Sequence, residues 1–206
     1  AYFDGASMRT IQGDLVEGDI WRVKYNVSNP KDTDEGLHPQ NIFRLVTRLK
    51  YKSPKQRVHF KINRYITSSS DNRNASNGIF FFHRYLDGDN LYYAGLRVDG
   101  DVVIKKKIGG QYFTLAQKKI FEGSYNRDLN PNLLPTKKYV GLETVIVDIE
   151  DGKVLIKVYV DYGDGVWALA LEGTDDGVTN GRTFVESGFS GIRTDFMDIE
   201  LNSYEV

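Results

Sequence analysis

Four residues have side chains of the types that can remove a proton next to a carboxylate: His59, Asn63, Tyr93 and Arg97. In such a β-elimination, an arginine or asparagine neutralises the carboxylate and a tyrosine or histidine takes the neighbouring proton. This chemistry needs no metal ion. The residue types therefore predict a candidate catalytic set, provided that the segments carrying them line one groove.

The same segments carry many further cationic and aromatic side chains. Arginine pairs with carboxylates and aromatic rings stack on sugar rings, so this mixture suits an anionic sugar polymer. On one sheet face these residues would form a basic surface in a chain whose net charge is only −1. The alternative is that they are solvated side chains that never converge. The predicted carbohydrate-binding residues are Arg44, Arg48, His59, Lys61, His83, Tyr85, Tyr93, Arg97 and Lys105, with Lys107 beside them.

The carboxylates and histidines of the sequence match neither a glycosidase pattern nor a metal-binding pattern. A retaining glycosidase places its two catalytic carboxyl groups in one groove, as a Glu-x-Asp-x-Glu strand does. Residues 146–150 (Ile-Val-Asp-Ile-Glu) and 196–200 (Phe-Met-Asp-Ile-Glu) lack the first of these carboxylates, so we interpret both as ordinary strands. His38, His59 and His83 show no metal-ligand spacing, and we expect no transition-metal site.

The elements that must position these residues are β-strands joined by tight turns. The chain has 13 Tyr, 11 Phe and 20 Gly, which favours strands and turns over helices. Asp99-Gly100, Gly109-Gly110 and Asp151-Gly152 separate β-rich runs, and such pairs form hairpin turns. We expect strands at residues 42–50, 57–65, 79–86, 91–98, 101–108, 111–116, 142–149, 154–161, 166–171 and 196–201, the last continuing towards residue 204.

Alternation along a strand predicts which side chains face the core. It places Tyr93 on the face opposite the core. Both faces of residues 79–86 begin apolar, so alternation there predicts only that His83 and Tyr85 share one face and Arg84 the other.

Two polar segments, residues 28–40 and 68–77, are expected to be loops, and long loops on a sandwich often carry the binding site. A plain surface excursion is the alternative. We expect no helix except a short turn near residues 130–134. Many short strands with closely spaced turns predict a sandwich or barrel, here as a single domain over residues 1–206.

Composition excludes several classes of protein. The near-zero net charge argues against a nucleic-acid binder, and no apolar run approaches the about 20 residues of a membrane-spanning helix. The chain has no cysteine, which excludes disulfides and thiolate chemistry. We expect no organic cofactor. The first residue, Ala1, fits a secreted or cell-surface protein, of bacterial origin, trimmed of a signal peptide.

Three stretches resemble a known group of proteins: residues 77–85 (Asn-Gly-Ile-Phe-Phe-Phe-His-Arg-Tyr), residues 89–100 (Asp-Asn-Leu-Tyr-Tyr-Ala-Gly-Leu-Arg-Val-Asp-Gly) and residues 188–198 (Gly-Phe-Ser-Gly-Ile-Arg-Thr-Asp-Phe-Met-Asp). They are similar to laminin-G-like members of the concanavalin A-like lectin and glucanase superfamily, over the last two-thirds of the chain. This resemblance implies an all-β fold, a two-sheet antiparallel jelly-roll sandwich. Because the superfamily includes enzymes, lectins and adhesion modules, it does not imply one function.

The resemblance also implies a structural Ca²⁺ between a carboxylate near the N-terminus and one near the closing strand, and the matching positions are Asp4 and Asp198. The motifs of the alginate lyases on this fold are not matched. Residues 44–48 (Arg-Leu-Val-Thr-Arg) lack the acidic centre of the alginate-lyase motif Arg-x-Glu-x-Arg, and residues 57–59 (Arg-Val-His) have Arg where Gln would stand.

Three functions stay open at this point. The leading hypothesis is a carbohydrate-binding domain that recognises a polysaccharide, acidic polymers included, on the face bearing Tyr, Arg and Lys. The second is a polyuronate lyase, which needs a Tyr/His pair within hydrogen-bonding reach of an Arg or Asn in one groove. The third is an adhesion module with a protein partner, marked by an exposed apolar patch instead of a polar groove.

Overall fold

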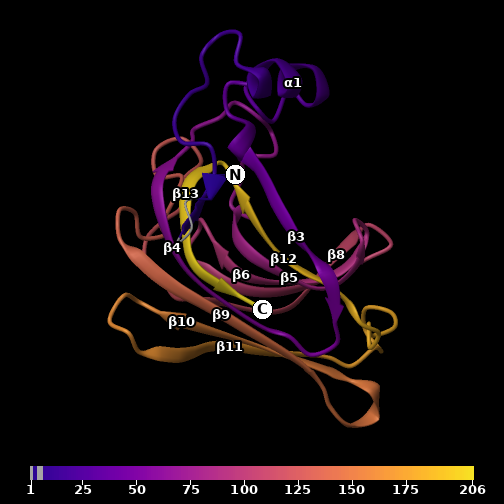
Figure 1. Cartoon of the computed structure of the whole chain (residues 1–206). Helices are drawn as coiled ribbons and strands as arrows, with labels where there is room; N and C mark the ends of the chain where they lie inside the picture. Colours follow the sequence, from indigo (N-terminus) through magenta and orange to yellow (C-terminus); the bar gives the residue numbers. More distant parts are fainter. Residues whose placement is uncertain (1, 4–6) are drawn as a thin grey trace.

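Two antiparallel sheets face each other across a shared hydrophobic core in the computed structural model, which describes residues 2–3 and 7–206 (Figure 1). The larger sheet has seven described strands, in the spatial order β1 (Tyr2–Phe3), β2 (Ser7–Arg9), β13 (Met197–Glu205), β4 (Lys55–Tyr65), β9 (Tyr139–Asp148), β10 (Val154–Asp161) and β11 (Trp167–Asp175). The smaller sheet has six, in the order β3 (Ile42–Tyr51), β12 (Gly188–Asp195), β5 (Gly78–Asp87), β6 (Asn90–Arg97), β7 (Asp101–Ile108) and β8 (Gln111–Lys119).

Strict alternation produces the core between the sheets. Val58, Phe60 and Ile62 of β4 are fully buried, and Tyr92 and Ala94 of β6 meet them from the opposite sheet. Burying such side chains stabilises the fold by about 1.5–3 kcal/mol for each large apolar residue. The predicted jelly-roll sandwich is confirmed, and each predicted strand lies where the sequence placed it to within a few residues.

The two long edges of the sandwich differ. β8 and β11 lie against each other across the gap between the sheets, where a Cβ added to Gly173 would come within 2.9 Å of the Cβ of Ala116. At the opposite edge of the smaller sheet, β3 pairs only with β12 among the described strands. One side of β3 is therefore open.

A helix that the sequence did not predict, α1 (Ile20–Ser28), stands at one end of the sandwich (Figure 1). It begins at Asp19, whose Oδ1 accepts a 2.8 Å hydrogen bond from the backbone N–H of Trp21. None of its residues is buried, although Ile20, Val23 and Val27 have the i, i+3, i+7 spacing of a helical apolar row. The helical turn predicted near residues 130–134 is wrong, because the structure has only turns and extended chain there. No described helix has the length and apolar character needed to cross a membrane.

The two predicted loops pack against each other at the same end. Ser70 donates a 2.6 Å hydrogen bond from Oγ to Asp32, and Ser68 donates a 2.5 Å bond to Asp34. The 3₁₀ helix η1 (Pro39–Asn41) leads from the first loop into β3, and a second, η2 (Glu150–Gly152), lies between β9 and β10. These contacts hold both loops beside the smaller sheet.

Candidate functional site

A pocket of about 470 Å³ lies on the outer face of the smaller sheet, the face turned away from the core, next to the two loops. Side chains that alternate with core residues form its floor, since Ile79, Ala94 and Ile192 point inward. Its size is within the range of small-molecule binding sites. The residues around it are Asp32, Asn41, Ile42, Arg44, Asn72, Asn74, Ser76, Asn77, Phe80, Tyr93, Lys105, Tyr112, Arg193, Asp195 and Phe196.

Strand register places the floor residues in neighbouring rows. Arg193 of β12 lies opposite Arg44 of β3 on one side and Phe80 of β5 on the other. In the next row, Tyr93 of β6 lies opposite Lys105 of β7. Phe80 and Tyr93 belong to a small buried apolar cluster on this outer face, which gives the pocket a rigid base.

Two tyrosines and an arginine are in contact on this floor. The rings of Tyr93 and Tyr112 stack with centroids 5.9 Å apart, and the guanidinium of Arg193 lies 5.8 Å from the ring centre of Tyr93. Burial raises the pKa of Tyr93 to about 12, although Arg193 opposes this. Burial also acts to raise the pKa of Tyr112, but interaction with Tyr93 and the positive charges of Arg193 and Lys107 outweigh it, so that pKa is lowered.

Three cationic side chains line the pocket, and only one of them has a carboxylate partner among the described residues. Arg193 donates a 2.8 Å hydrogen bond from Nε to Asp195 Oδ1. Among the described residues, no carboxylate lies within ion-pairing distance of Arg44 or Lys105. Burial and then the charge of Arg97 lower the pKa of Lys105, which shows that this ammonium is partly desolvated and near another cation.

The loop formed by residues 68–77 supplies the polar wall. Asn72 donates a 2.9 Å hydrogen bond to the carboxylate of Asp32, which fixes one loop to the other. Asn77 is buried, its Nδ2 donates to the carbonyl of Asn72, and its Oδ1 accepts from the backbone N–H of Asn74. The amides at this rim are thus held in place before any ligand arrives.

Some of the predicted binding residues do meet at this pocket. Arg44, Tyr93 and Lys105 line it. Arg97 and Lys107 lie on the same sheet, but neither lines the pocket; Arg97 is paired with Asp99 at 2.5 Å and Lys107 with Asp89 at 3.2 Å. Arg48 is exposed on β3, also outside the pocket lining.

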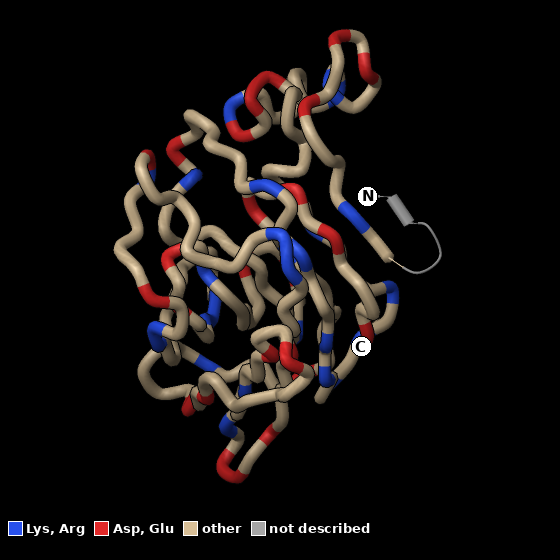
Figure 2. Tube along the Cα trace, turned by 90° about the vertical axis from the view of Figure 1, so that its left-hand side faces the viewer, with Lys and Arg blue, Asp and Glu red and all other residues tan. Residues whose placement is uncertain are grey.

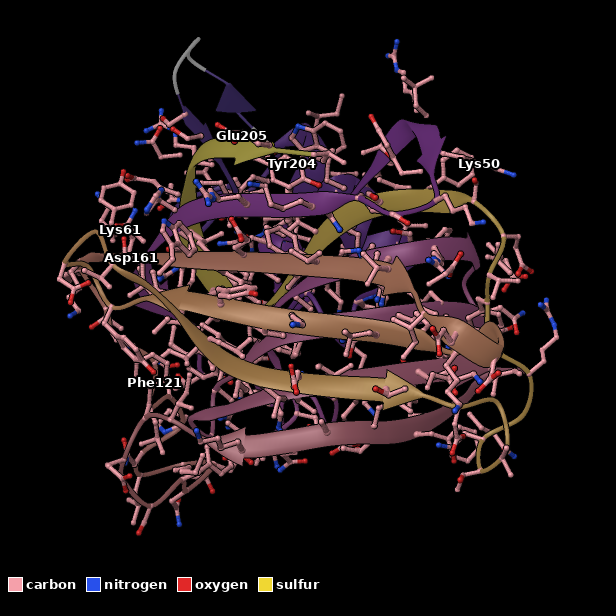
Figure 3. All side chains as sticks on the ribbon, turned by 90° about the horizontal axis from the view of Figure 1, so that it is seen from below. Lys50, Lys61, Phe121, Asp161, Tyr204 and Glu205 are labelled. Carbon is pink, nitrogen blue, oxygen red and sulfur yellow. The ribbon has the colours of Figure 1, made fainter. Side chains whose placement is uncertain are left out.

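The expectation that His59 and Lys61 share this face is wrong, because β4 belongs to the other sheet. There His59 faces Asp161 at 3.3 Å and Lys61 pairs with Glu200 at 2.8 Å, so each has its own acidic partner. Lys61 and Asp161 are labelled at the same end of the sheet in Figure 3. Figure 2 shows acidic and basic residues interspersed along the Cα trace.

The candidate catalytic set is divided for the same reason. His59 and Asn63 are on β4, whereas Tyr93 and Arg97 are on β6, across the core. The side-chain amide of Asn63 donates instead to Glu200, on β13 of the same sheet, and to Gln12, in the segment that follows β2. The structure therefore does not bring together the Tyr/His pair that the lyase hypothesis requires.

His83 cannot contact a ligand on the outer face, and its predicted pairing with Tyr85 is wrong. Arg84 has a φ of +47° and the strand pairing shifts there, which breaks the alternation. His83 lies before this break, in phase with Ile79 and Phe81, and points into the core, where Nε2 lies 2.6 Å from Thr144 Oγ1. Tyr85 lies after the break and packs on Phe82 of the outer cluster. Burial lowers the pKa of His83 to about 3.

The predicted calcium site is described only in part. Asp4 lies outside the described residues. The carboxylate of Asp198 accepts hydrogen bonds from Gly13 N at 2.9 Å, Gln40 Nε2 at 2.8 Å and Arg64 Nε at 3.0 Å. Both carboxylate oxygens of Asp198 therefore accept hydrogen bonds from described residues. Within the part of the chain that the structure describes, no three His, Asp or Glu residues are grouped to hold a metal ion.

Sequence reasoning placed Arg44, Tyr93 and Lys105 in the site, and missed Asn41, Tyr112, Arg193 and Asp195. Arg193 and Asp195 alternate with Ile192 and Thr194, and the same period-2 pattern places Tyr112 opposite Phe113. That pattern could have assigned them to an outer face. Asn41 carries no comparable pattern, because it lies in a 3₁₀ turn.

No family model matches the sequence, and no curated protein is similar to it at a significant level. Solved structures do resemble it in fold. The carbohydrate-binding module CBM66 from Bacillus subtilis superposes with a TM-score of 0.53 and 14% identity, covering 80% of this chain and 81% of the module. The acidic lectin of winged bean gives a TM-score of 0.49 and 12% identity over 78% of this chain and 76% of the lectin. A Bacillus subtilis protein of unknown function with a galectin-like fold gives 0.48 and 12% over 81% and 78%.

The two-sheet topology and the superposition on the Bacillus subtilis module agree with the resemblance found in the sequence. The chain has the concanavalin A-like jelly-roll fold.

Proposed function

We propose that this protein binds an acidic carbohydrate in the pocket on the outer face of the smaller sheet. One observation carries the proposal: Arg44 and Lys105 reach the same pocket, beside stacked tyrosines, with no carboxylate partner among the described residues. A sugar carboxylate would supply the missing partner. Charge-assisted hydrogen bonds of this kind are stronger than neutral ones.

The contrast with the larger sheet supports this assignment. On the larger sheet Arg57 pairs with Glu143, His59 with Asp161 and Lys61 with Glu200. The basic side chains of that surface therefore already have acidic partners. A ligand carboxylate would have to displace these partners. At the pocket it displaces none from Arg44 or Lys105.

Tyr112 offers the surface for a sugar ring. Its side chain is 52% exposed while Tyr93 beneath it is buried, so the stack holds the outer ring at a fixed angle. Such rings contact the apolar faces of sugars. The asparagines of the loop stand at the rim with side chains that can reach hydroxyl groups.

Binding is favoured over β-elimination by a Tyr/His pair, because none of the residues lining the pocket is a histidine. The adhesion hypothesis receives less support. α1 does expose Ile20, Val23 and Val27, but these belong to one nine-residue helix, whereas the pocket combines cations, amides and aromatic rings. The name of the Bacillus subtilis module agrees with carbohydrate binding, but the proposal rests on the pocket. We further propose an extracellular location, which fractionation of the producing cells would check.

The test is gel retardation in polygalacturonate, alginate and hyaluronate, with neutral laminarin as reference, at low and high salt. We expect retardation by at least one acidic polymer and not by laminarin, weakened by salt. Arg44→Ala and Lys105→Ala should each reduce it, whereas the matched control Arg48→Ala, an exposed arginine on the same strand outside the pocket, should not.

Absence of retardation in every polymer, or equal losses for Arg44→Ala and Arg48→Ala, would contradict the proposal. Absorbance at the unsaturated-uronate band is followed in the same samples. A rise in that band would show that the pocket cleaves its ligand, and would replace the binding function by a lyase.

A further inference from the structure

Two oxygen atoms at the edge of the pocket have no hydrogen-bond donor among the described residues. They are Oδ1 of Asn41 and Oδ2 of Asp195. Asn41 is 0% exposed and Asp195 is 4% exposed, and both line the pocket. Buried polar atoms in folded proteins are nearly always paired, so each of these acceptors is open to a donor from outside the chain, such as water or a ligand hydroxyl.

The remaining polar atoms of both side chains are already engaged. Asn41 donates from Nδ2 to the carbonyl of Asp32 at 2.9 Å and to the carboxylate of Asp34 at 3.1 Å. Asp195 accepts from Arg193 through Oδ1. These contacts fix the amide so that only its oxygen is free, and they leave the second carboxylate oxygen of Asp195 unoccupied. Both atoms act as acceptors and neither can donate.

These acceptors lie at one end of the pocket and a free cation lies at the other. Asp195 pairs with Ile42 at the end of β12 that adjoins the loops. Lys105 lies on β7, three strands away across β5 and β6. Three strand spacings correspond to about 14 Å between backbones. Because the side chain of Lys105 is long, its ammonium group can be nearer to these acceptors than the backbones are to each other.

We propose that Asn41 and Asp195 form a hydroxyl-binding subsite, which selects acidic sugars that carry free neighbouring hydroxyl groups on the ring edge opposite the carboxylate. This assignment rests on the carbohydrate-binding function proposed above. In a uronic acid ring, the carboxyl group on C5 and the hydroxyl groups on C2 and C3 lie on opposite edges. The carboxylate would meet Lys105 on β7, and the hydroxyls would donate to Asn41 and Asp195 at the other end of the pocket.

A metal ion is a poorer occupant than a hydroxyl pair. Arg193 contacts the same carboxylate and Arg44 lies opposite Arg193 on the next strand, so a second cation would be repelled. A hydroxyl group brings a donor without bringing charge.

The experiment compares polygalacturonate, alginate and hyaluronate before and after acetylation of their free hydroxyl groups. In all three polymers the uronate C2 and C3 hydroxyls are free until acetylated. Affinity of the polymer that binds best is measured for the unaltered protein, for Asp195→Asn and for Asp99→Asn. Asp99 is the matched control, because it too pairs with an arginine two residues earlier on the same sheet but does not line the pocket.

We expect acetylation to lower the affinity of the unaltered protein roughly tenfold to a hundredfold, the loss that follows from leaving buried acceptors unpaired. Asp195→Asn should lower it by a similar factor, because its Oδ1 position stays with Arg193 and an NH₂ donor then stands at the Oδ2 position. Acetylation should cost this variant little more, whereas Asp99→Asn should behave like the unaltered protein.

The hydroxyl subsite is overturned, with the binding function intact, if the polymer binds equally well before and after acetylation or if both aspartate variants lose the same affinity. If none of the unmodified polymers binds, the binding function fails and the subsite with it. Should Asp195→Asn not fold, as thermal melting would show, the comparison of the two polymer forms with the unaltered protein decides alone.

Discussion

The rings of Tyr93 and Tyr112 stack 5.9 Å apart although their strands, β6 and β8, are separated by β7. Tyr112 reaches across from its position opposite Lys107, while Tyr93 lies opposite Lys105. The two phenols are thereby placed in different surroundings, one buried and one exposed beside cations. Their pKa values move apart, and this separation can be measured.

The first prediction concerns this pair. A tyrosinate titration should show one tyrosine whose pKa is below the usual value of about 10. Tyr112→Phe should remove that component, and Arg193→Gln should raise its pKa, because a neighbouring positive charge favours the phenolate. Tyr85→Phe, which changes a tyrosine outside the pocket lining, is the control and should leave the component in place. A low-pKa component that persists in Tyr112→Phe would refute this assignment.

The second prediction concerns the pH dependence of stability. Burial lowers the pKa of His83 to about 3 in the folded chain, while an unfolded histidine has about 6.5. Between these values the unfolded state binds one more proton than the folded state. The free energy of unfolding should therefore rise with pH by up to about 1.4 kcal/mol per pH unit in this window, and the benefit is complete above the unfolded pKa.

Urea unfolding at several pH values between these limits checks the histidine. His83→Gln should reduce the pH slope relative to the unaltered protein. Thr144→Val is the informative control, since it removes the 2.6 Å hydrogen bond but keeps the buried imidazole. It should lower stability at all pH values and keep the slope. Equal slopes for the unaltered protein and His83→Gln would show that another group titrates.

The third prediction concerns a buried ion pair. Lys106 is fully buried and donates to Asp175 Oδ2 and to the carbonyl of Gly181, both at 2.8 Å, and Tyr92 donates to the same carboxylate. Lys106→Met should lower the free energy of unfolding by about 3–5 kcal/mol, because it leaves a buried carboxylate without its cation.

Removing both charges should cost less than removing one. We expect Lys106→Met combined with Asp175→Leu to recover much of the loss, as measured by urea unfolding. Lys157→Met is the matched surface control, since its ion pair with Glu172 is 3.6 Å long and exposed, and it should change stability by less than about 1 kcal/mol. A double variant as unstable as the sum of both single variants would argue against a coupled pair.

The fourth prediction concerns Asp161, whose Oδ1 accepts from the backbone N–H groups of Gly163, Asp164 and Gly165 at 2.8–3.0 Å. Burial acts to raise its pKa, but these bonds and His59 outweigh it, so the folded pKa is lowered. Its contribution is therefore present above the unfolded pKa of about 3.9 and is lost as pH falls through the folded value.

Asp161→Asn should accordingly destabilise the protein by about 1–3 kcal/mol at neutral pH, where the carboxylate is ionised. Thermal melting from neutral to acidic pH should show the two proteins converging in stability at low pH. Asp164→Asn, an exposed aspartate in the same turn, serves as control. A difference that stays constant down to the lowest pH would show that charge has no part in the effect.

The sequence could predict the strands and their inner faces because a period of two is a local property. Val58, Phe60 and Ile62 alternate with polar residues along β4, and all three are buried. Which sheet a strand joins depends on long-range pairing, and alternation contains no information about it. His59 was for this reason placed on the wrong surface, although its outward direction on β4 was correct.

Two further errors have local causes. The positive φ at Arg84 shifts the strand by one position, so His83 and Tyr85 end on opposite faces. The helix α1 buries none of its residues, and the capping side chain of Asp19 was the sequence feature that could have revealed it. The prediction that residues 68–77 form a loop agrees with the structure, and Asn72 and Asn77 of this loop line the pocket.

The open side of β3 has a consequence for how copies of this protein meet. Arg44, Arg48 and Lys50 are all exposed along this edge. Two such edges approaching each other would oppose cation to cation, which discourages sheet extension between molecules. Arg44 belongs to both the edge and the pocket, so binding of a polyanion as proposed above would also neutralise part of the charge along this edge. A polymer that bound several copies in this way would lower the repulsion between their β3 edges.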